Sequence, residues 1–375
     1  MFKGKLGILG GGQLGRMLIQ AGIDYNIKFK ILDPDANAPC NAIAEFQQGK
    51  LTDYDTVMRF ATDCEVISIE IENVNTKALK DLVAQGKKVF PQPEIIEIIQ
   101  DKRTQKEFYK KHQIPTADFI LVENKEDVIS NKNFLPAVNK LGKEGYDGRG
   151  VQVLRSENDL NKAFDAPGLL EKLIDFEKEI AVIVARNETG EIKSFPVVEL
   201  VFHPEANLVE YLFSPARIDN ALAKEAQQIA ENVIRSFNMV GLLAVEMFLT
   251  KDGKILVNEC APRPHNSGHQ SIESNITSQY HQHLRAILNL PLGDTAVIAS
   301  SAMVNLLGEH GYEGMASYEG LAECMQLSGV NIHLYGKQLT KPFRKMGHVT
   351  IVDNNMESLV RKANFVKETL KVKSA

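Results

Sequence analysis

The chain has 375 residues, 44% of them hydrophobic, and is long enough to form two or three packed domains with sizeable cores. Its formal net charge of −5 argues against a protein that coats nucleic acid or binds a membrane surface through charge. It has no apolar run near the ~20 residues of a membrane span, and its first residues enter a strand without the layout of a signal peptide. Four scattered cysteines without a C-x-x-C pair suit a reducing compartment, so we expect a cytoplasmic protein.

The first block of the chain alternates strands and helices. We predict strands at 5–10, 29–33 and 64–72, and helices over 16–25 and 76–86. Apolar strands separated by helical segments are typical of βαβ units in a parallel sheet. This sheet domain is expected to end near Pro91 and Pro93.

A glycine motif lies between the first strand and the first helix. Gly10, Gly12 and Gly15 satisfy G-x-G-x-x-G, and Asp33 lies at the end of the next strand. These features occur in the dinucleotide site of NAD-linked oxidoreductases, which is one interpretation of this block. However, the later sequence supplies no pocket for hydride transfer, and a glycine turn at a helix N-terminus can bind any phosphate.

The second block begins with one long charged helix predicted over 95–113. Strands around 135–141, 151–154 and 169–174 then complete a small α+β lid. Lys140 ends the first of these strands, and the glycine-rich turn GYDGRG follows at 145–150. A lysine and the backbone N–H groups of such a turn can bind phosphates, although the Walker sequence GxxxxGK[ST] is absent.

The segment LLEKLIDFEKE at 169–179 is predicted to be a strand that enters a short connector. Backbone groups of a connector can bind the edge of an adenine. Glu179, eight residues after Glu171, can accept hydrogen bonds from ribose hydroxyls. An ordinary solvated charged loop is the alternative interpretation of this segment.

The third block contains a helix over 219–237 and then a hairpin rich in oxygen ligands. Glu246 lies in the apolar run LLAVEMFLT, and after the turn KDGK a second apolar run ends in Asn258-Glu259. Two carboxylates buried side by side are unfavourable without a cation between them, and such ligands suit Mg²⁺. Arg263 can meet an anion at the same place. The alternative is a surface hairpin with solvated acids.

His265 and His269 have the i, i+4 spacing of a zinc-binding helix. Pro264 precedes this pair and Ser267-Gly268 interrupts it, so a regular helix is not expected, and thiolate partners at zinc spacing are missing. Loop hydrogen bonds to substrate or structural roles are the alternatives for these histidines. A helix near 275–289, a connector, and a final small sheet with a closing helix complete the block.

Taken in order, the lysine, the glycine loop, the E-K-x-I connector, the strand glutamate and the N-E pair resemble the ATP-grasp ligases. The segments GGGQLGRM, GYDGRG, NECAPRPHNSGH and GKQLTKPFRKMGH resemble, more narrowly, the N5-carboxyaminoimidazole ribonucleotide synthase family of purine biosynthesis, over about residues 5–350. The resemblance implies an ATP-grasp fold of mixed α/β and α+β class. Its parts are a Rossmann-like N-terminal domain (1–98), a lid domain (99–172) and a C-terminal domain with the metal hairpin and a small terminal sheet (173–375).

The resemblance also implies an activity, with ATP and Mg²⁺ as cofactors. Bicarbonate is phosphorylated to carboxyphosphate, which either yields CO₂ or directly carboxylates the amine of 5-aminoimidazole ribonucleotide, and a homodimer is expected. The alternatives are a formate-dependent glycinamide ribonucleotide transformylase-like enzyme and a noncatalytic nucleotide-binding subunit. The intact set of Lys140, Glu246 and Asn258-Glu259 argues against the second of these.

Carried over position by position, the resemblance implies three groups of site residues. ATP is bound by Lys102, Lys140, Gly145, Tyr146, Asp147, Gly148, Arg149, Gly150, Val151, Glu171, Lys172, Leu173, Ile174, Glu179, His203, Asn258 and Glu259. Mg²⁺ is held by Glu246, Glu259 and Asn258. The reacting groups are contacted by Tyr146, Asp147, Arg149, Arg263 and His265, and the ribonucleotide by Gln13, Leu14, Glu72, Asn266, Lys337, Arg344 and Lys345.

Some of these assignments carry a specific expectation. Asp147 is expected to take the proton from the amine or to orient it. The basic cluster of Lys337, Arg344 and Lys345 is expected to bind the 5′-phosphate, and a solvated charged face is the alternative interpretation that these residues alone would favour. Lys102 stands where the family often has arginine, and because Arg103 is adjacent, either cation could reach the nucleotide.

Overall fold

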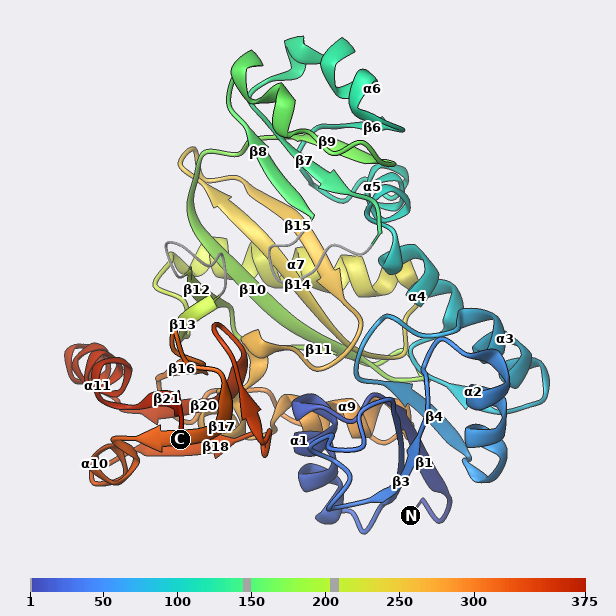
Figure 1. The fold of residues 1–375 in the computed structure, drawn as a ribbon, viewed down its shortest axis with the longest axis vertical. Coiled ribbons are helices and arrows are strands. Elements are labelled where there is room, and N and C mark those ends of the chain that lie inside the picture. Colours follow the sequence, from blue (N-terminus) through green and yellow to red (C-terminus); the bar gives the residue numbers. More distant parts are fainter. Residues whose placement is uncertain (1, 144–149, 203–208) are drawn as a thin grey trace.

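The computed structural model describes residues 2–143, 150–202 and 209–375 (Figure 1). The N-terminal domain is a parallel sheet in the order β3-β2-β1-β4-β5. Its strands are β1 (Lys5–Leu9), β2 (Lys28–Asp33), β3 (Glu45–Gln48), β4 (Val66–Ile69) and β5 (Lys88–Val89). The accompanying helices are α1 (Gln13–Ile23), α2 (Tyr54–Phe60), α3 (Thr76–Ala84) and α4 (Pro93–Gln100). The inner strands β1 and β4 are almost wholly buried, as expected for parallel strands covered on both faces.

The long helix predicted over 95–113 is wrong as a single element. The chain forms α4 and then α5 (Lys102–Lys111), and Asp101 between them has extended backbone angles. The Asp101 carboxylate accepts a hydrogen bond from the N–H of Arg103 and thereby caps α5. An N-cap residue must leave helical geometry, so this aspartate breaks the helix in a stretch that otherwise has helical periodicity.

The lid is an antiparallel sheet at the top of Figure 1, in the order β6-β9-β7-β8. Its elements are β6 (Phe119–Val122), α6 (Lys125–Ser130), β7 (Ala137–Leu141), β8 (Val151–Leu154) and β9 (Gly168–Lys172). The lid has a small apolar core of its own, which includes Val122, Val128 and Leu170. The connector after β9 leads directly into the central sheet.

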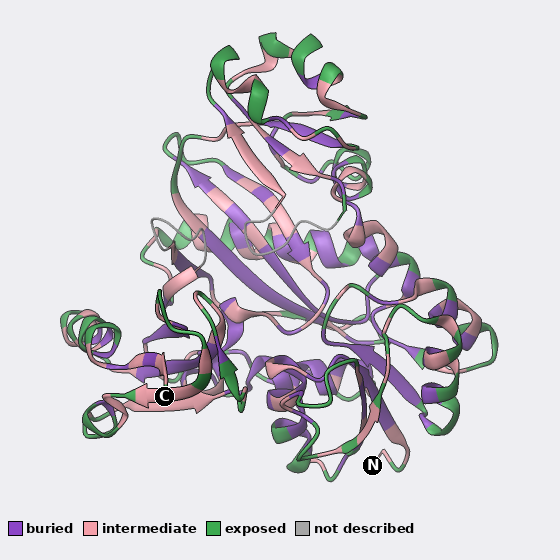
Figure 2. Cartoon of the chain, in the orientation of Figure 1, coloured by how far each residue is buried: buried purple, intermediate pink, exposed green. Residues whose placement is uncertain are grey.

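The central sheet runs β15-β14-β10-β12-β13-β16-β20-β18, with β11 paired to β10. Its first strands are β10 (Phe176–Arg186), β11 (Ile192–Ser194), β12 (Val198–Phe202), β13 (Val209–Ser214), β14 (Gly241–Thr250) and β15 (Ile255–Ala261). Helix α7 (Asn220–Phe237) packs on β10 and β14 through a large apolar cluster, and Figure 2 shows how fully these two strands are buried. Two further helices, α8 (Ser271–Ser274) and α9 (Gln279–Ile287), follow the hairpin.

The C-terminal part only partly matches the predicted small closing sheet. Strands β16 (Ser301–Leu307), β18 (Val330–Leu334) and β20 (Lys345–Val352) extend the central sheet through pairing of β16 with β13. A separate small sheet contains β19 (Leu339–Thr340), β17 (Gly314–Glu319) and β21 (Lys371–Ser374). Helices α10 (Leu321–Met325) and α11 (Met356–Thr369) complete this part, and no described helix is long and apolar enough to cross a membrane.

The N-terminal domain is held to the rest of the chain through α9. Helix α1 packs against α9, with Tyr280 and Leu284 in the shared apolar cluster. Beside this contact, the Ser68 hydroxyl of β4 lies 3.1 Å from Nε2 of His283, and both residues are fully buried. Burial lowers the pKa of His283 to about 3, because a charged imidazole there would lose its hydration.

This buried imidazole predicts sensitivity to acid. The unfolded chain binds the proton below about pH 6.5 and the folded protein only near pH 3, so stability falls as pH is lowered through that window, by up to about 1.4 kcal/mol per pH unit. We expect His283→Gln to show a shallower fall of Tm between pH 6.5 and 4.5 than the unchanged protein, measured by scanning calorimetry. The exposed His310 provides the control, as His310→Gln. An unchanged slope in His283→Gln would contradict this account.

Candidate active site

The hairpin of β14 and β15 brings the two predicted metal-binding carboxylates together. Glu246 lies directly opposite Glu259 in the antiparallel register, and the register shifts between Glu246 and Met247. Opposite residues of paired strands point to the same face, so the two carboxylates share one side of the sheet. Glu179 on β10 pairs with Phe248, two residues after Glu246, and therefore lies diagonally beside Glu246 on that face.

The charges at this place are strongly coupled. Burial raises the pKa of Glu246, and the nearby negative charge of Glu259 raises it further. The Lys102 ammonium holds the pKa of Glu259 well below its usual range. Burial also raises the pKa of Glu179 to about 7. The carboxylates of Glu246 and Glu259 are hard oxygen ligands of the kind that a divalent cation prefers, and a cation between them would remove the repulsion that raises the pKa of Glu246. Among the described residues, no group of three or more acidic, histidine or cysteine side chains is placed to hold a metal ion.

Two lysines from outside the hairpin reach its polar end. Lys102, the first residue of α5, donates a hydrogen bond to Oε2 of Glu259. Lys140, near the end of β7 in the lid, places Nζ 2.9 Å from Oδ1 of Asn258 and 2.6 Å from Oε2 of Glu171. The lid and the hairpin therefore meet through cations that can also bind phosphates.

The neighbouring cation Arg103 points elsewhere. Its Nε and Nη2 lie 3.1 Å and 2.8 Å from the two carboxylate oxygens of Asp101, in a bidentate pair. Its Nη1 is 3.6 Å from a carboxylate oxygen of Glu123. Of the two adjacent cations, it is Lys102 that faces the hairpin.

The connector after β9 combines a buried acid with backbone contacts. The Glu171 side chain is only 3% exposed and forms ion pairs with Lys106 and Lys140 at 2.6 Å each. Lys172 donates to the carbonyl of Phe134 at 2.8 Å, and the N–H of Leu173 donates to the carbonyl of Pro136 at 3.1 Å. Ile174 follows, partly buried, on the way to β10.

The segment after β15 joins the hairpin to the N-terminal domain. Nε of Arg263 lies 2.9 Å from Oε1 of Glu72, so this guanidinium, which was expected to meet an anion beside the hairpin, is paired with an acid of the first domain. Nε2 of His265 lies 3.7 Å from Oε1 of Glu246, and Nδ1 of the same ring is 2.9 Å from the Ser267 hydroxyl. Asn266 exchanges amide hydrogen bonds with Asn305 at 2.8 and 2.9 Å.

The N–H groups of the glycine turn before α1 are bound by an acid that the sequence did not predict. The carboxylate of Glu70, at the end of β4, accepts hydrogen bonds from the N–H groups of Gly12 and Leu14. Asp33 accepts from the N–H of Gly11 at 2.7 Å. The donors that would bind a dinucleotide phosphate are thus used within the chain, which argues against the NAD interpretation. The Leu14 side chain is itself buried in the domain core, whereas Gln13 is partly exposed.

The late basic residues come together only in part. Nζ of Lys337 donates to the carbonyl of Lys345 at 2.7 Å, and the charge of Lys345 is close enough to Glu246 to lower the pKa of that carboxyl. Arg344 instead donates to the carbonyl of Leu339 at 2.7 Å. The lid-loop positions Gly145, Tyr146, Asp147, Gly148 and Arg149, together with His203, lie outside the described residues. Gly150 and Val151 are described, and Val151 begins β8 opposite Lys140.

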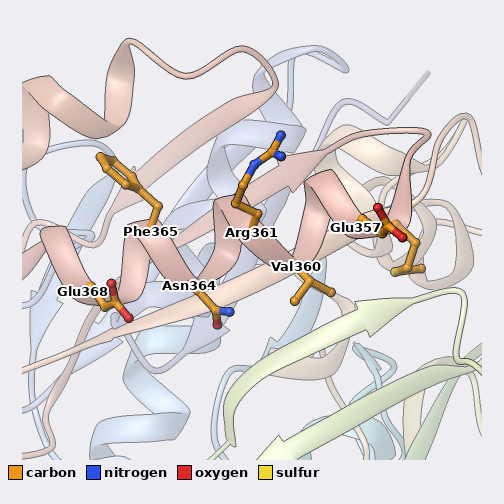
Figure 3. Close-up of a pocket in the computed structure, with 7 residues that line it drawn as sticks. Glu357, Val360, Arg361, Asn364, Phe365 and Glu368 are labelled. Carbon is orange, nitrogen blue, oxygen red and sulfur yellow. The ribbon is translucent and has the colours of Figure 1, made fainter.

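A hollow of about 640 Å³ lies along α11, at a distance from this cluster (Figures 1 and 3). Its lining side chains all come from that one helix and include Val360, Arg361 and Phe365. A single helix face presents no convergent set of acids and lysines. We therefore place the chemistry at the hairpin.

Comparison with known proteins agrees with this placement. The chain matches a ribonucleotide synthetase preATP-grasp domain over residues 3–100, an ATP-grasp domain over 107–280 and a phosphoribosylaminoimidazole carboxylase C-terminal domain over 301–362. It is 35% identical to N5-carboxyaminoimidazole ribonucleotide synthase of Bacillus subtilis, over 92% of this chain and 91% of that protein. The chain belongs to the N5-carboxyaminoimidazole ribonucleotide synthase family.

Other members of this family, and a longer relative, give the same result. The synthetase from Thermotoga maritima has a solved structure that matches with 42% identity and a TM-score of 0.91, covering 99% of this chain and 100% of that one. The synthase from Aspergillus clavatus, solved with ADP and 5-aminoimidazole ribonucleotide, matches with 32% identity and a TM-score of 0.89, covering 97% and 98%. Phosphoribosylaminoimidazole carboxylase of the yeast Ogataea methanolica is 38% identical over 97% of this chain, which spans 69% of that longer protein.

These matches confirm the predicted ATP-grasp fold and identify the chain as an ATP-dependent ligase of the synthase family. The N-terminal glycine-rich domain is the preATP-grasp domain of a ribonucleotide synthetase, not a dinucleotide-binding domain. The C-terminal match is to the carboxylase, which favours this family over the glycinamide ribonucleotide alternative.

Two buried residues at the site were absent from the sequence prediction. Lys106 lies one helical turn after Lys102, so the i, i+4 spacing of two lysines on a helix was a signal that could have identified it. Glu70 precedes Glu72 by two residues in E-I-E at the end of a strand.

The different directions of Lys102 and Arg103 predict different effects on nucleotide binding. We expect Lys102→Met to weaken ATP binding about 10-fold or more, because a charge-assisted contact to phosphate is lost. Arg103→Met should lower Tm through loss of its pair with Asp101 and leave the ATP Kd within about twofold. Calorimetric titration with ATP and thermal unfolding of both variants measure this. Equal weakening of ATP binding by the two substitutions would contradict the assignment.

Proposed function

We propose that this ligase uses MgATP and bicarbonate to carboxylate the exocyclic amine of 5-aminoimidazole ribonucleotide. A bicarbonate oxygen attacks the γ-phosphorus, the bond to ADP breaks, and carboxyphosphate forms. The amine nitrogen then bonds to the carboxyl carbon, phosphate leaves and the amine gives up a proton. The observation that carries this proposal is the meeting of Lys102 and Lys140 with the Glu246–Glu259 pair. Phosphoryl transfer requires this kind of positioning and charge neutralisation more than covalent participation by the protein.

Glu246 and Glu259 would hold Mg²⁺, with Asn258 beside them. The raised pKa of Glu246, caused by burial and by Glu259, supports this because it marks an acid pair that lacks a full counter-charge. The phosphate charge would be neutralised by Mg²⁺ if these residues held it. Lys102 and Lys140 would turn from their internal partners to the phosphates, and Glu179 would accept from the ribose.

The acceptor ribonucleotide would lie between the hairpin and the N-terminal domain. The ion pair of Arg263 with Glu72 spans this boundary. Gln13 of the N-terminal domain and Asn266, which follows the hairpin, are both partly exposed polar residues. Lys337 and Lys345 would bind the 5′-phosphate. Asp147 would take or orient the amine proton, and closure of the lid would exclude water from carboxyphosphate. The homodimer and the cytoplasmic location remain predictions from the resemblance.

The proposed reaction is tested by its dependence on both substrates. Purified protein is given MgATP and bicarbonate, with and without 5-aminoimidazole ribonucleotide, and ADP release and carboxylated product are measured. We expect product only with all components present. Turnover that instead requires formate and glycinamide ribonucleotide would overturn the proposal and favour the transformylase alternative.

The proposed metal role is tested at Glu259. We expect Glu259→Gln to abolish turnover and to weaken binding of MgATP, because the amide cannot replace a carboxylate ligand, while the circular dichroism spectrum is retained. Asp252→Asn, in the exposed turn of the same hairpin, is the matched control and should keep full activity. Near-normal activity of Glu259→Gln at limiting Mg²⁺ would refute the metal role of this residue.

A further inference from the structure

Lys106 is a buried ammonium at the junction of three structural parts. It belongs to α5, its side chain is 3% exposed, and its Nζ lies 2.6 Å from Oε1 of Glu171 in the lid strand β9. The same Nζ donates to the hydroxyl of Thr116, which in turn donates to the carbonyl of Val257 at 2.6 Å. Val257 directly precedes Asn258 in β15, so Lys106 connects the lid to the hairpin.

The carboxylate of Glu171 is shared between two lysines. Oε1 faces Lys106 and Oε2 faces Lys140, each at 2.6 Å. Burial lowers the pKa of Lys106 to about 8, so its ammonium still carries a charge at neutral pH. Glu171 therefore has a full counter-charge in Lys106 even when Lys140 turns away.

This arrangement matters for ATP binding, because Lys140 has competing partners. If Lys140 were the only cation beside Glu171, it would leave behind an unpaired buried carboxylate whenever it moved to a phosphate, which is strongly unfavourable. With Lys106 present, the carboxylate stays neutralised, and its attraction for Lys140 is reduced.

Building on the proposed function, we propose that Lys106 is a positioning residue for ATP: by neutralising Glu171 it releases Lys140 to bind the phosphates. Lys106 is not required to touch the nucleotide. Its effect is exerted on the phosphates through Lys140, and the adenosine part of the nucleotide should be bound independently of it.

The test compares ATP with adenosine as ligands. In Lys106→Met, Lys140 becomes the only cation paired with Glu171 among the described residues. We expect ATP binding to weaken about 10-fold while the competitive inhibition constant of adenosine changes less than about twofold. Lys106→Gln removes the charge but keeps a hydrogen-bond donor, and it should show the same selective loss of ATP affinity. This variant serves as the test if Lys106→Met does not fold. Lys110→Met, an exposed position on the same helix, is the matched control.

A double variant tests whether Lys106 affects ATP binding through Glu171. In the Glu171→Gln background the carboxylate that holds Lys140 is gone, so adding Lys106→Met should change ATP affinity by less than about threefold relative to Glu171→Gln alone. Equal losses for ATP and adenosine, or a full loss of ATP affinity on adding Lys106→Met to Glu171→Gln, would overturn the role of Lys106 and reduce it to a structural ion pair. An unchanged protein that does not bind ATP would instead overturn the proposed function.

Discussion

The site depends on alternating charges where the lid meets the hairpin. Lys106, Glu171, Lys140 and Asn258 follow one another in contact, and Lys102 with Glu259 lies beside them. None of these side chains could be buried alone without a large loss of hydration energy. Because the members come from α5, β7, β9 and β15, satisfying their charges also fixes how the lid sheet stands over the central sheet (Figure 1).

In the N-terminal domain, too, buried polar groups are satisfied by partners within the chain. Its glycine turn is completed from within by Glu70, whose carboxylate takes the N–H groups that a phosphate would otherwise use. Glu72, two residues later, points instead to Arg263 beyond the hairpin. The two acids after β4 thus have different roles. Glu70 stabilises the glycine turn of its own domain, and Glu72 connects that domain to the segment after the hairpin.

The sequence predicted those parts of the fold and site that follow from local pattern. The hairpin could be predicted because its turn and its apolar runs set the pairing of the two strands as far as Met247 and Val257. The register shift beyond that pair, which brings Glu246 opposite Glu259, was not predicted. The break of the helix at Asp101 was missed, because a single capping residue does not disturb helical periodicity. The extension of the central sheet by β16 was missed for another reason: its pairing with β13 depends on residues almost a hundred positions apart, which no local pattern encodes.

Long-range pairing also explains why Lys106 and Glu70 were not predicted from the sequence. Their importance lies in partners that are distant in sequence: Glu171 is the partner of Lys106, and the N–H groups of the glycine turn are the partners of Glu70. Lys102 and Lys140 are held by carboxylate and amide oxygens, as phosphate oxygens would hold them. Under the proposed function, binding of MgATP would be an exchange of partners: phosphates would replace Glu259 and Glu171 at the lysines, and Glu246 and Glu259 would be left to hold the metal ion. The lysines are already desolvated and oriented before the nucleotide arrives, so much of the unfavourable cost of burying charge is met during folding, and not during binding.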